Sequence, residues 1–295
     1  MRDVADAVIL AGGRGTRMLP STTYAPKEIL PLIDTPILNH LIWEACKAGV
    51  KRIHIVISPN KQKIISKIIN GRNIIWEDEV RRDLPRIALN PIPQNIKIIL
   101  HEQIIPGGVG DAILLAKKSI NGPFLVLLGD NLLISDHVGP LKSGPDYASD
   151  SSKRLVDYFN KTGIPCAGIL EVPDNQVNKY GIVRLKANMI KDIVEKPKIE
   201  DAPSNFILCG RYLLPHNTEE ILNLYPTSEY GELQSIALFD HFIKNGGFGS
   251  INLNEFALYD SGDPISWLKS QIDHALRRDD LNTDFRRWIA DRLIR

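Results

Sequence analysis

The chain has 295 residues, and its 36 lysines and arginines nearly balance its 35 aspartates and glutamates. A net charge of +1 excludes a global field that would attract nucleic acid or an anionic membrane, so any anion must be bound by locally placed charges. The three cysteines are far apart and form no C-x-x-C pair, which argues against a disulfide framework or a zinc site and fits a reducing compartment.

The chain begins MRDVADAVIL, which leads directly into a strand and lacks the apolar core of a signal peptide. No apolar run approaches the roughly 20 residues that cross a bilayer. We therefore expect a cytoplasmic protein that binds neither nucleic acid nor a membrane.

Strands and helices alternate in the first half of the chain. Short apolar runs predict strands at residues 6–10, 52–58, 97–101 and 124–128. Helical spacing of apolar residues predicts helices at 36–48, 62–69 and 110–118. This alternation predicts an α/β fold with a Rossmann-like, mostly parallel sheet flanked by helices. Ligands of such sheets bind beyond the carboxyl ends of the strands.

The second half mixes strands and helices. We expect strands at residues 167–171, 181–186, 190–195, 206–214 and 250–258. Helices are expected at 219–223, 233–245, 264–278 and 284–293. Residues 70–95 are charged and contain prolines, and we interpret them as an insertion whose amphipathic piece, at 74–84, suits a packing surface.

The most informative stretch follows the first predicted strand, where residues 8–11 run into Gly12-Gly13-Arg14-Gly15-Thr16-Arg17. A glycine-rich turn after a strand presents bare backbone N–H groups to an anion. Arg17, and Lys27 in a following Pro-Lys-Glu step, add positive charge that suits a polyphosphate. We interpret this stretch as a nucleoside-triphosphate site, with Ala11, Gly12 and Gly13 at the nucleotide.

Two better-known phosphate loops do not fit these glycines. A P-loop needs a Lys-Ser or Lys-Thr pair after its last glycine, and none is present. A dinucleotide-binding loop needs a third glycine where Met18 stands, and an acidic residue near the second strand, which ends Ile57-Ser58-Pro59. A dinucleotide-dependent dehydrogenase is therefore disfavoured.

Further motifs follow along the chain: Gly108-Val-Gly-Asp-Ala112, Leu128-Gly-Asp-Asn131, Tyr180-Gly-Ile-Val183, Val194-Glu-Lys-Pro-Lys198, Gly231-Glu-Leu-Gln234, Asp260-Ser-Gly262 and Thr283-Asp-Phe-Arg-Arg-Trp288. Together with the glycine-rich stretch, they resemble the sugar-1-phosphate nucleotidylyltransferases over nearly the whole chain and in the order of that family. Within the family, the chain is most similar to the bacterial uridylyltransferases that use UTP and glucose 1-phosphate.

The resemblance implies a Mg²⁺-dependent enzyme that converts UTP and α-D-glucose 1-phosphate into UDP-glucose and diphosphate. An oxygen of the sugar phosphate would attack the α-phosphorus in line while pyrophosphate leaves. Such a nucleophile is already anionic, so catalysis rests on positioning and charge compensation. Members of the family are commonly dimers or tetramers, so a homodimer or homotetramer is implied.

Two aspartates are candidate metal ligands. Asp130 and Asp260 each follow a predicted strand, and Mg²⁺ is often held by one or two carboxylates together with phosphates. The resemblance assigns the metal to both, assigns the triphosphate to Arg17 and Lys27, and assigns the phosphate of the sugar to Lys196.

The resemblance also implies which residues contact the base and the sugar. A glutamine side chain offers both a donor and an acceptor, as reading a pyrimidine edge requires, and Gln103 with Gly108 has the spacing of the family's base contacts. Gly181, Glu195 and Glu232 match positions that hold the sugar. In this interpretation residues 1–295 are one domain, with a nucleotide-binding half (1–135), a sugar-phosphate-binding half (136–262) and C-terminal helices (263–295).

Three departures from the uridylyltransferase pattern leave alternatives open. The Gly-Asp-Asn form that ends at Asn131 is more like the thymidylyltransferases, so dTTP remains an alternative to UTP. Asp111 replaces a usual histidine and Arg184 a common acidic residue; we expect both to touch the sugar side, which leaves another sugar or cyclitol phosphate open. A non-catalytic regulator that binds a nucleotide sugar is an alternative of a different class, although a sensor would not need both metal carboxylates and Lys196.

Overall fold

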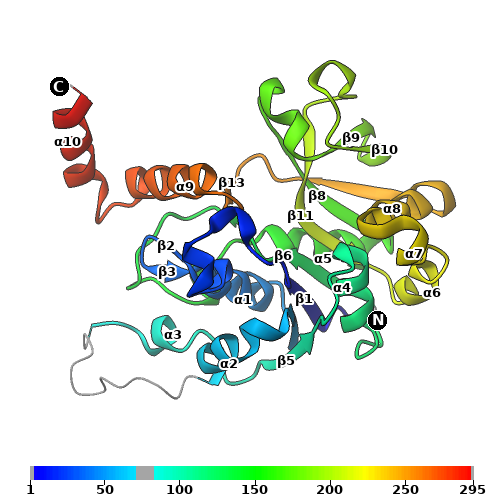
Figure 1. Cartoon of the computed structure of the whole chain (residues 1–295), viewed down its shortest axis with the longest axis horizontal. Helices are drawn as coiled ribbons and strands as arrows, with labels where there is room; N and C mark the ends of the chain where they lie inside the picture. Colours follow the sequence, from blue (N-terminus) through cyan, green and yellow to red (C-terminus); the bar gives the residue numbers. More distant parts are fainter. Residues whose placement is uncertain (1–2, 71–82, 294–295) are drawn as a thin grey trace.

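The computed structural model describes residues 3–70 and 83–293. Nine strands form its central sheet: β1 (Asp6–Ala11), β4 (Arg52–Ile57), β5 (Lys97–Glu102), β6 (Phe124–Leu128), β8 (Cys166–Glu171), β9 (Gly181–Lys186), β10 (Met189–Glu195), β11 (Phe206–Leu214) and β12 (Phe248–Asn252). Their order across the sheet is β5-β4-β1-β6-β11-β8-β12-β10-β9. Figure 1 shows this sheet with the helices around it. The strands predicted before residue 250 are confirmed to within one residue at either end.

The sheet is mixed, so the prediction of a mostly parallel sheet is right for one half and wrong for the other. β5, β4, β1 and β6 run parallel, as the strand–helix alternation predicts. β11 is antiparallel to β6 and β8, and β10 is antiparallel to β9 and β12. Between β9 and β10 the chain turns at Ala187, with φ 52°, and so short a connection can only return a strand antiparallel. A further pairing of Ile207 with Ile182 joins β11 to β9 and makes this part barrel-like.

Helices cover both faces of the parallel half. The described helices are α1 (Ile37–Lys47), α2 (Gln62–Asn70), α3 (Arg86–Leu89), α4 (Gly108–Lys117), α5 (Ser151–Thr162), α6 (Thr218–Leu222), α7 (Thr227–Tyr230), α8 (Gln234–Asn245), α9 (Pro264–Arg277) and α10 (Asn282–Leu293). Successive side chains of a strand point to opposite faces of a sheet. Accordingly, Ala7 and Ile9 of β1 pack in one core with α1 and α5, and Val8 between them packs in a second core with α4 and α8.

Two short ribbons lie outside the main sheet. β2 (Pro31–Leu32) pairs with β3 (Thr35–Pro36), and β7 (Asn131–Ile134) pairs with β13 (Ala257–Asp260). The single strand predicted at 250–258 is therefore wrong. β12 ends at Asn252 and the chain turns before β13 begins, with the N–H of Phe256 donating to the carbonyl of Leu253.

The predicted insertion at 70–95 falls only partly within the described residues, and its amphipathic piece, 74–84, lies almost wholly outside them. Beyond it, the chain after α3 is tied to α1, because the indole N–H of Trp43 donates to the carbonyl of Pro91 at 2.9 Å. Within residues 3–70 and 83–293, every helix is too short or too polar to cross a bilayer.

A buried ion pair joins α1 to β11 near the end of β6. The guanidinium of Arg211 on β11 donates to both carboxylate oxygens of Glu44 on α1, at 2.7 and 2.8 Å, and both side chains are almost fully buried. The same guanidinium donates to the backbone carbonyl of Asn131 at 2.9 Å. Arg211 therefore fixes the backbone directly after Asp130.

The N-terminus of α9 is held by Asp263, which supplies a prediction for stability. Its carboxylate accepts from the N–H groups of Ile265 and Ser266 at 3.0 Å, and these bonds are the main reason that its pKa lies below 3.8. We expect Asp263→Ala to lower the free energy of unfolding by about 1 kcal/mol at neutral pH. Because the pKa is lowered in the folded state, this contribution should be lost as the pH falls below 3.8.

Chemical denaturation of the wild type and of Asp263→Ala at several pH values measures this difference. Asp279→Ala, an exposed aspartate beyond the end of α9, is the control. A difference that stays constant down to low pH would show that the cap does not act through its charge.

Candidate functional site

Asp130 and Asp260 come together although 130 positions separate them. Asp130 lies in the turn from β6 to β7, and Asp260 is the last residue of β13. In the ribbon of β7 and β13, Asp260 pairs with Asn131. The N–H and the hydroxyl of Ser261 both donate to the carbonyl of Asp130, at 3.0 and 3.1 Å, which ties the two ends together. The ribbon therefore places both predicted metal ligands at one point.

The electrostatics around Asp260 favour a cation. Burial raises the pKa of Asp260, and repulsion from Asp130 and Asp263 adds to that rise, while the N–H of Gly262, at 2.6 Å, and Lys27 oppose it. A positive charge between the carboxylates would relieve this repulsion. Within the described residues there is no group of three or more His, Cys, Asp or Glu side chains that could hold a metal without a substrate. Two carboxylates completed by phosphate oxygens remain the arrangement that Mg²⁺ commonly adopts.

Lys27 links this pair to the glycine-rich loop. Its ammonium lies 2.5 Å from Oδ2 of Asp130, and its side chain is 11% exposed. The same ammonium lies 4.0 Å from the position that a Cβ on Gly13 would occupy. A phosphate bound at the backbone of Gly13 would therefore meet Lys27 directly.

Arg17 lies close to the turn that follows Asp260. One guanidinium nitrogen is 2.9 Å from the position of a Cβ on Gly262, two residues after Asp260. The pKa of Asp263 is lowered mainly by the first N–H groups of α9, with a smaller contribution from Arg17. Arg17 is otherwise exposed, so its charge is available to a ligand.

A second buried ion pair supports the loop from behind, and sequence reasoning missed it. The ammonium of Lys61 donates to both carboxylate oxygens of Glu28, at 2.9 and 3.0 Å, and to the carbonyl of Ala11 at 2.6 Å. Burial lowers the pKa of Lys61 and raises that of Glu28, and each partner opposes the effect on the other. The pair thus fixes the end of β1 and the residue next to Lys27. The sequence could have pointed to this contact, because Lys61 follows β4 closely and the glycine-rich loop follows β1. The carboxyl ends of neighbouring parallel strands lie at one edge of a sheet, so side chains that follow them can meet.

Gln103 and Gly108, the predicted base contacts, lie together. The side chain of Gln103 is 8% exposed and its Oε1 lies 2.8 Å from the position of a Cβ on Gly12. Its Nε2 donates to the carbonyl of Gly108 at 3.3 Å and to Oδ2 of Asp111 at 2.6 Å. The expectation that Asp111 touches the sugar side is therefore wrong: the first turn of α4 directs its carboxylate to Gln103.

Glu232 and Arg184 lie in two different parts of the structure, near α4 and on β9 respectively. Glu232 is exposed, and its Cα lies 3.0 Å from the position of a Cβ on Gly108, whose φ of +85° suits glycine. The structure thus places Glu232 beside the N-terminus of α4. Arg184 is exposed on β9, and its guanidinium lies 3.4 Å from the carboxylate of Asp192 on β10.

Gly181, Glu195 and Lys196 form one group where β9 begins and β10 ends. Gly181 pairs with Glu195, whose Oε2 lies 2.9 Å from the position of a Cβ on the glycine. The N–H of Lys196 donates to the carbonyl of Tyr180 at 3.0 Å, and its ammonium lies 3.4 Å from Glu195. Lys196 has φ +46°, a conformation that costs a residue with a side chain about 1–3 kcal/mol and clusters at functional sites.

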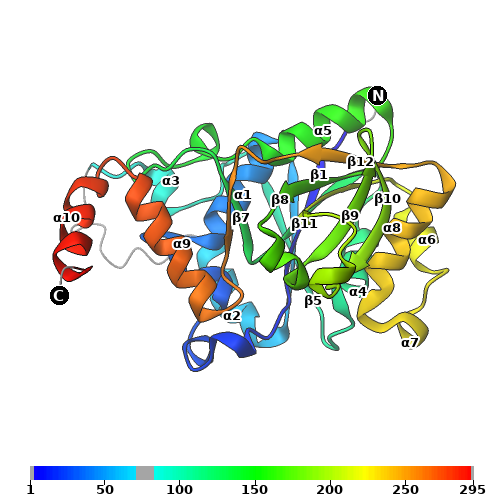
Figure 2. The ribbon, with the colours of Figure 1, turned by 90° about the horizontal axis from the view of Figure 1, so that it is seen from above.

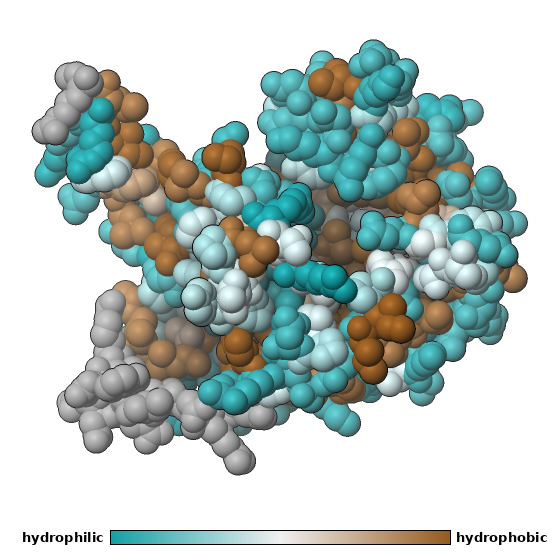
Figure 3. Space-filling view, in the orientation of Figure 1, coloured by the Kyte–Doolittle hydropathy of each residue, from teal (hydrophilic) through white to brown (hydrophobic). Residues whose placement is uncertain are grey.

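Tyr180 directly precedes Gly181 in the sequence, and it is close enough to Asp260 for that charge to affect its pKa. Burial raises the pKa of Tyr180, and the nearby negative charges of Asp260 and Asp263 add to that rise. In the space-filling view the surface is hollowed between the lobe of β9 and β10 and the side that carries β13 (Figure 3). The strand pair β9–β10, which carries Glu195, and the strand β13, which carries Asp260, therefore lie on two sides of this hollow.

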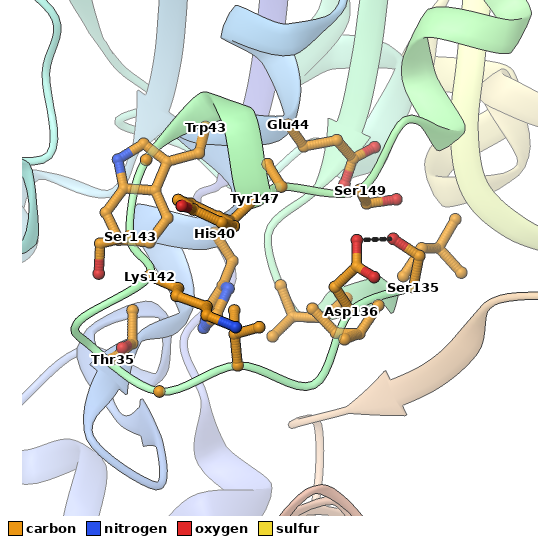
Figure 4. Close-up of a pocket in the computed structure, with 17 residues that line it drawn as sticks. Thr35, His40, Trp43, Glu44, Ser135, Asp136, Lys142, Ser143, Tyr147 and Ser149 are labelled. Carbon is orange, nitrogen blue, oxygen red and sulfur yellow. Dashed lines mark hydrogen bonds between the residues drawn. The ribbon is translucent and has the colours of Figure 1, made fainter. Parts of the chain in front are cut away.

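A separate cavity of about 20 Å³ lies between α1 and residues 132–149 (Figure 4). His40, Glu44, Lys142 and Ser149 are among its lining residues, and none of the predicted site residues is. Its volume holds about one water molecule, so it cannot admit a nucleotide.

Comparison with known proteins identifies relatives of this chain. Residues 6–270 match the family model described as nucleotidyl transferase. The UTP–glucose-1-phosphate uridylyltransferase 2 of Streptococcus pyogenes is 31% identical over 300 residues, covering 98% of this chain and 96% of the relative. The UTP–glucose-1-phosphate uridylyltransferase of Staphylococcus epidermidis is also 31% identical, and 98% of each chain is covered.

Solved structures give the same result. The UDP-glucose pyrophosphorylase of Acinetobacter baumannii superposes with a TM-score of 0.80 at 25% identity, covering 98% of this chain and 99% of that one. A UTP-bound form from the same organism gives a TM-score of 0.79 at the same identity. The matched family region runs from β1 into α9 and contains every residue of the site described above, and the chain belongs to the nucleotidyl transferase family.

Proposed function

We propose that the protein is a UTP–glucose-1-phosphate uridylyltransferase, which forms UDP-glucose and diphosphate from UTP and α-D-glucose 1-phosphate. The observation that carries the proposal is the meeting of Asp130, Asp260 and Lys27 at the end of the glycine-rich loop. The names and coverage of the relatives at 31% identity support the choice of UTP and glucose.

Each charged group has a role in this reaction. The backbone of Ala11, Gly12 and Gly13 would bind the nucleotide, and Arg17 with Lys27 would hold the triphosphate and the departing pyrophosphate. Lys196 would bind the phosphate of the sugar and reduce its repulsion from UTP. Gly181, Glu195 and Glu232 would position the sugar, and Gln103 with Gly108 would contact the base.

Bond making and breaking need no covalent enzyme intermediate. An oxygen of glucose 1-phosphate forms a bond to the α-phosphorus of UTP, and the bond to the β-phosphate oxygen breaks, so the electron pair leaves with pyrophosphate. The attacking oxygen is already ionised, so no general base is required. Asp130 and Asp260 would hold Mg²⁺, which supplies positive charge at the α-phosphate and the sugar phosphate when bound. In the present structure the ammonium of Lys27 supplies the positive charge beside Asp130.

We infer a nucleotide-binding half at 1–135, a sugar-phosphate-binding half at 136–262 and C-terminal helices at 263–295. A release assay for pyrophosphate, crossing four nucleoside triphosphates with several sugar and cyclitol 1-phosphates, tests the proposed reaction. The expected result is the highest kcat/KM for UTP with glucose 1-phosphate. A preference for dTTP or for another phosphate would replace the proposed substrates, and release with no pair would refute the enzyme and favour a nucleotide-sugar-binding regulator.

We further infer that a second copy of the chain covers α9 and α10. Both helices extend away from the sheet, and none of the described α10 residues is buried (Figures 1 and 2). They expose apolar side chains: Ile265 (62%), Leu268 (50%), Trp288 (50%) and Leu293 (82%). A 12-residue helix is marginal without packing, so a partner is expected to stabilise α10.

Trp288→Glu tests this interface. We expect the wild type to sediment as a homodimer or homotetramer and the variant to dissociate, because a buried charge at the interface is unfavourable. Leu224→Glu, at a leucine that is 62% exposed after α6, is the control and should leave the assembly unchanged. A monomeric wild type, or an unchanged Trp288→Glu assembly, contradicts the inference.

A further inference from the structure

We propose that Asp111 selects the base of the nucleotide by fixing the side-chain amide of Gln103 with its oxygen toward the base. The proposal rests on the function proposed above and adds a specificity-determining residue to it. Asp111 does not itself contact the base in this account. It acts through Gln103 and is a positioning residue.

The contacts of Gln103 determine which end of its amide is free. Both acceptors near Nε2 are unable to donate: Oδ2 of Asp111, at 2.6 Å, belongs to a carboxylate, and the carbonyl of Gly108, at 3.3 Å, is backbone. The amide nitrogen must therefore face α4. Oε1 points the other way, over Gly12 of the nucleotide loop, where a Cβ would lie 2.8 Å from it. Gln103 is 8% exposed, so little water competes for these bonds.

The position of Asp111 is itself built by the loop before α4. A Cβ on Gly107 would lie 2.7 Å from both Cβ and Cγ of Asp111 and 2.8 Å from its Oδ2. The carboxylate thus occupies space that only a glycine leaves open. A carboxylate in the first turn of a helix is favourable in any direction. The helix alone therefore does not explain why this one turns to Gln103.

An amide that presents only its oxygen discriminates between pyrimidines at one ring atom. Uracil carries an N–H at position 3, which can donate to Oε1 of Gln103. Cytosine has an unprotonated nitrogen there, whose lone pair would face the lone pairs of the same oxygen. A site built to bond a substrate N–H rejects an analogue that lacks it, because the buried polar atom is left unpaired.

Asp111→Asn tests this account with little change of shape. An asparagine can either accept from or donate to Gln103, so both orientations of its amide become available. We expect the ratio of kcat/KM for UTP to that for CTP to fall about 10- to 100-fold, mainly through the KM values. Gly107→Ala should also lower this ratio, because the added methyl group displaces the carboxylate of Asp111 without removing its charge. Glu220→Gln, which removes an exposed carboxylate from the first turn of α6, is the control and should leave the ratio unchanged.

Binding of UTP and of CTP to the wild type and the variants, measured by calorimetry without sugar phosphate, gives a second readout that does not need turnover. An unchanged UTP to CTP ratio in a folded Asp111→Asn protein would overturn the proposal and leave the uridylyltransferase function intact. A wild type that binds UTP and CTP equally would overturn it as well. A wild type that prefers UTP in binding but releases no pyrophosphate would refute the proposed enzyme and not the role of Asp111.

Discussion

Replacing Asp130 with asparagine is expected to lower kcat about 10²- to 10³-fold, equivalent to about 3–4 kcal/mol of transition-state stabilisation. The carboxylate has two functions that the amide cannot perform. It would bind Mg²⁺ together with Asp260, and it balances the ammonium of Lys27 at 2.5 Å. We also expect the Mg²⁺ concentration for half-maximal rate to rise more than about tenfold. Steady-state kinetics at several Mg²⁺ concentrations measures both effects.

The fold should survive this change, because Asp130 lies in a turn and its side chain is 25% exposed. Asp157→Asn is a matched control that removes a carboxylate paired with Lys153 on the exposed face of α5, where such pairs contribute little. A kcat of Asp130→Asn within about threefold of the control would remove Asp130 from the proposed metal site.

Lys196→Ala should lower kcat/KM for glucose 1-phosphate about 10²-fold or more, because it removes the cation proposed to bind the attacking phosphate. The KM for UTP should change much less. The backbone supports a dedicated position for this lysine, since Lys196 keeps φ +46° and its N–H is bonded to Tyr180. Initial rates measured with each substrate varied in turn give the KM for UTP and the kcat/KM for glucose 1-phosphate separately.

Lys198→Ala removes an equally basic, exposed side chain on the other side of Pro197 and is the control. Arginine at 196 keeps the charge, so Lys196→Arg should recover part of the lost activity if charge is what matters. Equal losses for the alanine variants at 196 and 198 would show a diffuse effect of positive charge rather than a specific contact.

The sequence predicted the parallel half of the fold well because its signals are local. Each buried strand is a short apolar run, and each helix between them has apolar residues at helical spacing. α5 was not predicted, because its buried apolar residues are few (Leu155, Val156 and Phe159) and polar residues surround them. The antiparallel pairs around β11 depend on long-range partners, which no local period reveals.

For the candidate site too, the sequence predicted the local features and missed the long-range ones. The end of a parallel strand places the glycine-rich loop and Asp130 at one edge of the sheet, so their proximity followed from the alternation of elements. Asp260 was assigned through family resemblance, and the ribbon of β7 and β13 is what brings it to Asp130. β7 was not predicted from the sequence. Its residues Asn131–Ile134 are mostly apolar and directly follow a Gly-Asp turn, which is consistent with a short strand.

What the sequence did not predict are contacts between distant side chains. The pairs of Lys61 with Glu28 and of Arg211 with Glu44 are buried ion pairs, which no composition or spacing distinguishes from surface charges. The same holds for Asp111, because the sequence does not show whether its carboxylate faces the sugar side or Gln103 until the turn at Gly107 is known.

The most direct measurement is a crystal structure of the protein with a non-hydrolysable UTP analogue, glucose 1-phosphate and Mn²⁺, in which anomalous scattering locates the cation. The account predicts one Mn²⁺ bound by a carboxylate oxygen from each of Asp130 and Asp260 and by oxygens of both phosphates, with Lys196 at the sugar phosphate. A cation bound elsewhere, with either aspartate turned away from the phosphates, would contradict it.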